Sequence, residues 1–515
     1  MARKPRRLAA IDVGTNSIHM MIVECQGRAC RVIDKEKEMV QLGEGSLGGA
    51  PLTSGAIERA VEALARMADI ARKWNVDRLE AVATSAVREA PNRRAFVKAV
   101  EAASGIKLRV ISGQAEASLI FRAVRSAVDF QGGTALCIDI GGGSVEIISG
   151  TESEVFFTAS EPLGALRLTQ RFFQNDPPLP EEIEKCRRHA RKRLRKVLRA
   201  GVAPGFDFCI GTSGTITTLA ELASSETPGE PVASGLRWLE LSALEDLTSR
   251  LASISARERV EGFGLEPKRA ATIVAGALVL TEFLRAAGVK RMRACSAALR
   301  EGMIERLLEE KETATPRSSG GVRRRAIVDL AERSGVDKVH AAHVSRLALR
   351  IFDETREVHG LKAADREILE YSALLHEIGL HVSFQGYHKH TYYLIRHAGL
   401  RGFTDDQVAL IANVARYHRK ATPSEKHENF RELAPRHRKT VERAAAILRL
   451  ADALDRGRKQ AVRDIGVDGD GGRLRFRARP RADSSTEMAA AEKQARYFAR
   501  VFERPTEVTL DRERS

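Results

Sequence analysis

Two short segments of the chain repeat one pattern of residues that could bind phosphate. Asp12 ends an apolar run, a glycine follows two positions later, and a serine comes three positions after that; the same pattern begins again at Asp139. Glycines in such a turn let backbone N–H groups approach an anion, and the serine hydroxyl adds another donor. An aspartate at a strand end can hold a hydrated divalent cation or orient water. The repeat therefore indicates two related lobes that close on one phosphate chain.

Apolar runs rich in Ile and Val flank both turns, which predicts strand–turn–strand in each case. The first segment reads LAAIDVGTNSIHMMIVE and the second reads ALCIDIGGGSVEIISG. Two ordinary hairpin turns are the structural alternative. The candidate phosphate contacts in these turns are Asn16, Ser17, Gly141, Gly142, Gly143 and Ser144.

Two further strand ends carry hydroxyl groups, in the segments ATSAVREAPN and GTSGT. An arginine in the first offers a bidentate fork to a terminal phosphate. The second precedes a helix, where free N–H groups favour anions, although Thr or Ser there could simply cap the helix. The candidate residues are Thr84, Ser85, Arg88, Gly211, Thr212 and Ser213.

Glu116 is the candidate general base of a hydrolase. It lies at the start of a predicted helix directly after a strand, between the two turns in sequence. A carboxylate there can accept a proton from water that attacks phosphorus. The helix dipole also favours a glutamate at this position, so the residue type alone does not assign the role.

The composition describes a basic protein of several domains. The 515 residues carry a formal charge of +16 with 5% aromatic residues, which favours polyanion partners but not specific nucleic-acid recognition. The six cysteines form no CxxC pair, so we expect reduced thiols and a cytoplasmic location. Asp12 interrupts the first apolar stretch before it could act as a signal core, and we expect no run long enough to span a membrane.

Strand-like and helix-like stretches alternate in the N-terminal part, which predicts α/β layers. Residues 312–324 are rich in Pro, Ser, Gly and Arg and read as a linker. We predict an α/β lobe over 1–125, a second lobe over 126–311, an all-α domain over 325–460 and a small α+β module over 461–515. A helix near 181–199 carries nine Lys or Arg; we interpret it as a solvated cationic face, with a funnel for polyphosphate as the alternative.

The ordered motifs DVGTNSIHMMIVE, ATSAVREAPN, ISGQAEASLIF, IDIGGGSVEII, GTSGTITTL and SAALREG closely resemble the exopolyphosphatase / guanosine pentaphosphate phosphohydrolase (Ppx/GppA) family. LLHEIGLHVSFQGYHKHTYYLI resembles the C-terminal region of its long form. The resemblance implies two actin-like (RNase H-like) lobes with an interdomain cleft. It also implies hydrolysis that depends on Mg2+, with Mn2+ as the alternative, and release of orthophosphate from the ends of inorganic polyphosphate.

The resemblance also implies roles for individual residues. Glu116 would be the catalytic base, Asp12 and Asp139 would handle metal and water, and Glu146 would assist them. The family often has two adjacent acids where this chain has Ala115 followed by Glu116, so the role falls on Glu116 alone. The rival activity is removal of the 5′ phosphate from guanosine pentaphosphate, and a non-catalytic polyphosphate or nucleotide sensor ranks below it. We also consider a homodimer, which would extend the basic surface available to polyphosphate.

The helical domain contains histidines in the order of another metal-binding pattern. His343, then His376-Glu377, then Asp452 resembles the His…His-Asp…Asp set of HD-type phosphohydrolases. The second member of the His-Asp pair is Glu377 here, and its longer side chain fits a tight metal shell less well. We therefore favour a retained HD-like helical scaffold, with an independent metal site as the alternative.

Overall fold

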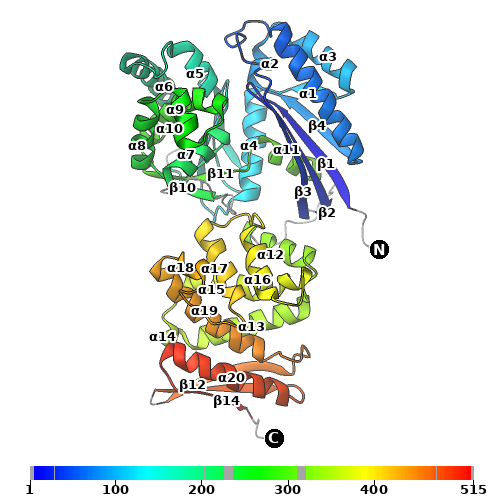
Figure 1. The fold of residues 1–515 in the computed structure, drawn as a ribbon, viewed down its shortest axis with the longest axis vertical. Helices are drawn as coiled ribbons and strands as arrows, with labels where there is room; N and C mark the ends of the chain where they lie inside the picture. Colours follow the sequence, from blue (N-terminus) through cyan, green and yellow to red (C-terminus); the bar gives the residue numbers. More distant parts are fainter. Residues whose placement is uncertain are drawn as a thin grey trace. The chain divides into compact units, whose positions relative to one another are not determined.

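The computed structural model describes residues 5–27, 29–201, 205–224, 236–309, 321–470 and 472–511. The chain divides near residue 318 into two compact units, each of which is described by itself below (Figure 1). Residues 312–320 of the predicted linker (312–324) lie outside the described residues.

The first lobe of the first unit is built on a five-stranded sheet with the strand order β3-β2-β1-β4-β5. The first three strands form an antiparallel meander, and β4 and β5 continue the sheet in parallel with β1. The strands are β1 (Arg6–Val13), β2 (Ile18–Gln26), β3 (Ala29–Glu38), β4 (Arg78–Ala83) and β5 (Leu108–Val110). The helices are α1 (Ser54–Lys73), α2 (Ser85–Glu89), α3 (Arg93–Ser104) and α4 (Gly113–Ala127).

The second lobe repeats this plan on a six-stranded sheet with the order β10-β11-β9-β6-β7-β8. In the order β8-β7-β6-β9-β11, these strands pair as β3-β2-β1-β4-β5 do in the first lobe, and β10 is one additional strand at the edge. This topology confirms two lobes of the RNase H-like, actin-like type. The strands are β6 (Ala135–Ile140), β7 (Val145–Gly150), β8 (Val155–Glu161), β9 (Phe208–Thr212), β10 (Leu236–Glu240) and β11 (Arg291–Cys295). The helices are α5 (Ala165–Phe172), α6 (Pro180–Gly201), α7 (Gly214–Ser224), α8 (Leu241–Ala252), α9 (Ala256–Phe263), α10 (Pro267–Ala287) and α11 (Leu299–Glu309).

Helices α4 and α11 lie between the two sheets and share one core with both (Figure 1). Alternate residues of β1 serve different cores: Ala9 and Ile11 pack under α1, whereas Leu8 and Ala10 face α4 and α11. β6 divides in the same way between the second lobe's own core and this shared layer. The predicted boundary between residues 125 and 126 falls within α4, and α11 packs on α4 although it comes from the end of the second predicted segment.

Helix α10 is long and apolar enough to cross a membrane by length and composition, so the prediction that the chain has no such run is wrong. However, 72% of its apolar window is buried, and residues on every side of it belong to the core of the second lobe. A helix that is apolar all round is typical of the centre of a large core.

Cys25 and Cys30 form a disulfide, so the prediction of six reduced thiols is wrong for this pair. The pairing register of β2 and β3 places the two cysteines directly opposite each other, with their Cα atoms 4.1 Å apart. The other four cysteines are free and buried.

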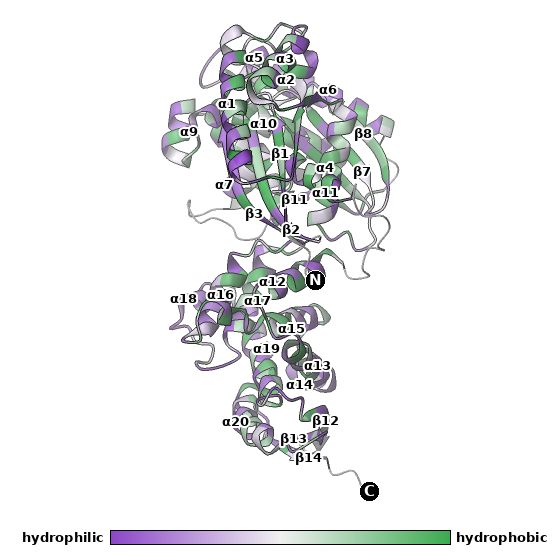
Figure 2. Cartoon of the chain, turned by 90° about the vertical axis from the view of Figure 1, so that its right-hand side faces the viewer, coloured by the Kyte–Doolittle hydropathy of each residue, from purple (hydrophilic) through white to green (hydrophobic). Residues whose placement is uncertain are grey.

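The second unit combines a helical bundle with a small sheet, and one hydrophobic core runs through both. Figure 2 shows apolar residues along its inner helices and strands. The helices are α12 (Val322–Arg333), α13 (Lys338–Glu354), α14 (Arg356–His359), α15 (Ala363–Leu375), the 3-10 helix η1 (Ile378–His381), α16 (Tyr387–Arg396), α17 (Asp405–Arg416), α18 (Glu428–Arg431), α19 (Pro435–Ala453) and α20 (Ser485–Phe502). The sheet contains β12 (Val462–Asp470), β13 (Arg473–Pro480) and β14 (Thr506–Leu510). The predicted boundary at 460/461 marks a change of secondary structure within this shared core.

Candidate active site

Two aspartates end the central strands of the two lobes on the faces that look toward the shared layer. Asp12 continues the Leu8–Ala10 side of β1, and Asp139 continues the corresponding side of β6, because side chains alternate along a strand. Glu116 lies in the first turn of α4 within that layer, and the Ser112 hydroxyl fixes the start of α4 by accepting a hydrogen bond from the backbone N–H of Ala115. The fold therefore brings together three acids that are far apart in the sequence.

The two turns that follow the aspartates close in the same way. The Gly14 N–H donates to the Ser17 carbonyl at 3.0 Å, and the Gly141 N–H donates to the Ser144 carbonyl at 3.0 Å. In both hairpins the aspartate pairs across the sheet with the residue seven positions later, His19 in the first lobe and Glu146 in the second. The sequence repeat is thus also a structural repeat, with an imidazole in one lobe where the other has a carboxylate.

The carboxyl groups are costly to ionise in these positions. Burial raises the pKa of Asp12 to about 7 and the pKa of Asp139 to about 6. Asp12 Oδ1 is buried and has no hydrogen-bond partner among the described residues, whereas Asp139 Oδ2 accepts a short hydrogen bond from the Thr212 hydroxyl. Burial also raises the pKa of Glu116 to about 7, against the attraction of Arg88.

Glu146 is the fourth acid of this group. It is almost fully buried, and burial together with the charges of Glu116 and Asp139 raises its pKa well above the ordinary value. Its Oε1 accepts a hydrogen bond of 2.7 Å from the Ser160 hydroxyl. Four clustered carboxylates, one with an orphaned buried oxygen, form the all-oxygen donor set that suits Mg2+, and such an ion would offset their mutual repulsion.

Arg88 holds the candidate base in place. Its Nη1 donates to Glu116 Oε2 at 2.8 Å and to the Ile111 carbonyl at 3.1 Å. The guanidinium also lines a cavity of about 750 Å³ that includes Ser144 and Arg167. Arg88 therefore contacts Glu116 and also borders the cavity in which an anion could lie.

Arg167 forms hydrogen bonds with both lobes, and no sequence motif predicted this role. From α5 its Nε donates to the Gly143 carbonyl at 2.7 Å, and its Nη2 donates to both oxygens of Glu89 on α2 at 2.7 and 2.9 Å. The Ser85 hydroxyl donates to the same Glu89 at 3.0 Å. Thr84 precedes α2 in a buried position, without a capping hydrogen bond from its side chain.

The glycines of the second turn are required by close packing against the first lobe. A Cβ on Gly143 would lie 2.5 Å from Ser85 Oγ and 2.8 Å from Thr15 Oγ1. A Cβ on Gly142 would lie 3.2 Å from Thr15 Cβ. The Asn16 carbonyl accepts a hydrogen bond from the backbone N–H of Gln41. Gln41 begins a glycine-rich segment (41–49), and this composition is a sequence signal for a segment packed closely on the first turn. The two turns therefore meet directly.

The strand end at 211–213 supports the candidate site in a different way from that predicted. Gly211 lies within β9, where a Cβ would clash with Met292 and Ile216, so this residue belongs to the core instead of a phosphate loop. Thr212 orients Asp139, as described above. Ser213 accepts a hydrogen bond of 3.3 Å from the N–H of Ile216 and so caps α7, which was the alternative for this loop.

In the second unit, three of the four predicted HD-like residues come together and the fourth does not. His376 and Asp452 lie 3.5 Å apart and Glu377 is nearby, but His343 Nε2 lies 2.9 Å from the Val462 carbonyl. His340, one turn earlier on α13, takes the place predicted for His343. The helix turns His340 toward α15 and α19, whereas His343 points to β12; this corrects the predicted set.

Comparisons with known proteins agree with this architecture. The sequence model of the Ppx/GppA phosphatase family matches residues 21–311, and that of Ppx/GppA phosphatase domain III matches residues 322–468. An uncharacterised protein of Streptomyces coelicolor is 34% identical over 306 residues, which cover 59% of this chain and 91% of that protein.

Two solved structures are similar to this chain at 28% sequence identity. Each match covers 60% of this chain and 100% of the chain in the solved structure. One is the Ppx/GppA family member of Aquifex aeolicus, with a TM-score of 0.53, and the other is an exopolyphosphatase from Cytophaga hutchinsonii, with a TM-score of 0.56. With the repeated turns and their clustered acids, these matches show that the chain belongs to the Ppx/GppA phosphatase family.

Proposed function

We propose that this phosphatase is an exopolyphosphatase that releases orthophosphate from the ends of inorganic polyphosphate with the help of Mg2+. The observation that carries the proposal is a group of four acids at the place where the two equivalent turns meet: Glu116, Asp139 and Glu146 are buried, and Asp12 is half-buried with one buried oxygen. The Cytophaga hutchinsonii structure described as an exopolyphosphatase supports the same substrate class. A cytoplasmic location and a homodimer belong to the same proposal.

In the proposed reaction Glu116 accepts a proton from water as the water oxygen forms a bond to the terminal phosphorus. The bond from that phosphorus to the bridging oxygen breaks, and the electron pair leaves with the shortened chain. Backbone N–H groups and hydroxyls of the two turns would hold the phosphate oxygens, and Arg88 would share its guanidinium between them and Glu116. Asp12, Asp139 and Glu146 would hold Mg2+, which neutralises charge on the phosphate when bound.

A basic groove on α6 favours a polymer over a nucleotide. Six Lys or Arg residues line this groove of about 600 Å³. The sequence favours a solvated cationic face for this helix, because basic residues occur on several of its sides; the groove supports the alternative, a surface that attracts polyphosphate. Arg191 pairs with Glu282, but Arg195 and Arg199 have no ion-pair partner among the described residues. Unpaired cations along one groove attract a linear polyanion by long-range steering.

The test compares orthophosphate release from long-chain polyphosphate and from guanosine pentaphosphate, each with Mg2+ and with chelator. We expect Mg2+-dependent release from the polymer, with the nucleotide a weaker substrate and a weaker competitor. Faster release from guanosine pentaphosphate would assign the rival activity, and tight polymer binding without turnover would assign a sensor.

The contribution of α6 can be tested in the same assay. The double variant Arg195→Ala/Arg199→Ala should raise KM for long polyphosphate several-fold and leave the turnover of short chains unchanged. Arg257→Ala is the matched control, because Arg257 is an exposed arginine of the same lobe that pairs with Glu261. Equal KM values for the double variant and the control would remove α6 from the proposal.

A further inference from the structure

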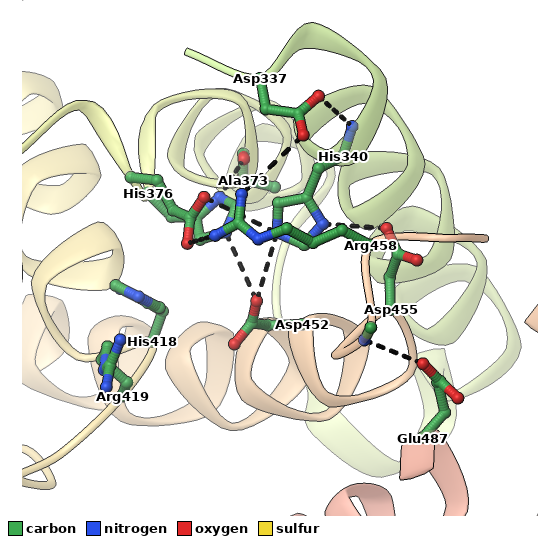
Figure 3. A network of polar contacts seen from close by, with 12 residues as sticks. Asp337, His340, Ala373, His376, His418, Arg419, Asp452, Asp455, Arg458 and Glu487 are labelled. Carbon is green, nitrogen blue, oxygen red and sulfur yellow. Dashed lines mark hydrogen bonds and ion pairs between the residues drawn. The ribbon is translucent and has the colours of Figure 1, made fainter. Parts of the chain in front are cut away.

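A second buried cluster of metal-binding side chains lies in the second unit. His340 from α13, His376 at the end of α15 and Asp452 from α19 converge on one point (Figure 3). His340 Nε2 and His376 Nε2 lie 3.6 and 3.5 Å from Asp452 Oδ1. Both histidines are almost fully buried, and neither Nε2 atom has a hydrogen-bond partner among the described residues.

The outer nitrogen of each ring is fixed by a hydrogen-bond acceptor. His376 Nδ1 lies 2.7 Å from the Ala373 carbonyl, and His340 Nδ1 lies 2.9 Å from Asp455 Oδ2. A carbonyl or carboxylate accepts a hydrogen bond, so Nδ1 carries the proton and the lone pair of the neutral ring is on Nε2. This outer arrangement is the one that orients metal-ligating histidines in proteins.

Asp455 belongs to this outer arrangement. It is completely buried, and its Oδ1 accepts a hydrogen bond of 2.8 Å from the backbone N–H of Gln460. His340 is held at its backbone as well, because Asp337 caps α13 by accepting from the His340 N–H at 3.1 Å. The ligand face of His340 is thus fixed from two directions.

The separations suit one ion bound between the side chains. Ligand atoms about 2.1 Å from a tetrahedral metal lie roughly 3.4 Å from each other, close to the distances from Asp452 to both rings. Glu377 offers a fourth donor, with its Oε2 3.9 Å from His340 Nε2. Its Oε1 accepts hydrogen bonds from Arg458 at 2.6 Å and from Tyr387 at 3.2 Å, which leaves Oε2 for the ion.

We propose that His340, His376, Asp452 and Glu377 bind one divalent transition-metal ion in the second unit. Two imidazoles with carboxylates favour Zn2+, Mn2+, Fe2+ or Co2+ over Mg2+ and Ca2+, which prefer oxygen ligands alone. The site uses residues of the second unit only, and none of them belongs to the group proposed for polyphosphate hydrolysis.

The test is metal binding by the full chain, stripped with chelator and then titrated with Co2+ in the presence of excess Mg2+ to occupy all-oxygen sites. We expect one Co2+ per chain, with visible absorption bands of a nitrogen-ligated ion and displacement by Zn2+. His376→Gln and Asp452→Asn should each weaken Co2+ binding at least tenfold, and Asp455→Asn, which acts through His340, by about 10–100-fold.

His343→Gln is the matched control, because His343 is a buried histidine of the same helix that faces Val462 instead of the cluster. It should keep wild-type Co2+ affinity and spectrum. The proposal is overturned if the wild-type chain binds no Co2+ or gives a spectrum of oxygen ligands only. It is equally overturned if the nearly isosteric Asp452→Asn variant binds as tightly as the control, so the test does not depend on the folding of His376→Gln.

Discussion

Replacing Glu116 by glutamine should remove most orthophosphate release and preserve the fold. The residue is only 7% exposed, and its Oε2 accepts the 2.8 Å hydrogen bond from Arg88. Glutamine has the same shape and can accept this bond, so the loss on the folded side is that of an ion pair reduced to a hydrogen bond from a charged donor to a neutral acceptor, about 1 kcal/mol. Loss of a buried charge acts in the opposite direction, because burial raises the pKa of Glu116 to about 7.

The kinetic effect should be much larger than the effect on stability. A positioned general base contributes about 10²–10⁴-fold, which corresponds to about 3–5 kcal/mol in the activation free energy. The base works only when ionised; with a pKa of about 7, about one tenth is ionised at pH 6 and about nine tenths at pH 8. Ionisation of Glu116 should therefore raise wild-type kcat/KM about tenfold over this interval, and the residual activity of the variant should lack this contribution and rise less steeply.

The assay is orthophosphate release from polyphosphate between pH 6 and pH 8 at saturating Mg2+, with the unfolding midpoint measured alongside. Ser118→Ala is the control, because Ser118 is an exposed residue of the same helix whose hydroxyl bonds only within α4. If Glu116→Gln releases phosphate at a rate close to that of the control, or keeps the wild-type pH profile, the assignment of the base is refuted.

Three further outcomes follow from described contacts. Arg167→Met breaks the bridge to Glu89 and should lower the free energy of unfolding by about 2 kcal/mol in chemical denaturation; an unchanged midpoint would mean that the bridge adds nothing. Hydrogen bonds from the backbone N–H groups of Gln174 and Leu179 hold the pKa of Glu182 below its usual value. The stability that ionised Glu182 contributes is therefore present above its pKa in the unfolded chain and is lost as pH falls through its pKa in the folded chain. Glu182→Gln should therefore lower the melting temperature at neutral pH and flatten its fall in acid, and parallel curves for variant and wild type would contradict this. Thiol titration of the denatured, unreduced chain should count four reactive cysteines, whereas a count of six would exclude the disulfide.

The strand–turn–strand repeats and the α/β alternation were readable because they depend on local period and turn chemistry. Asp12 and Asp139 could be placed on one side of each strand for the same reason. Arg167 could not be found in this way, because its partners come from α2 and from the second turn, and only tertiary packing joins them.

The histidine set shows the same limit on a smaller scale. His340 and His343 are one turn apart on one helix, so the amphipathic pattern does not distinguish them. The packing of α13 between α19 and β12 decides which of them meets Asp452. The pairing of Cys25 with Cys30 likewise depends on the hairpin register, which the spacing of cysteines does not encode.

The layer of α4 and α11 between the two sheets has a consequence for how the first unit folds. Gly302 of α11 allows very close contact with α4, because a Cβ there would overlap the Leu119 carbonyl. Neither sheet can cover its inner face without these two helices, and α11 is the last described helix of the unit along the chain. An isolated first lobe would expose the apolar side of β1 and β2 to water. The lobes are therefore expected to unfold in one cooperative transition, and a nascent chain completes its first lobe only after its second has been made.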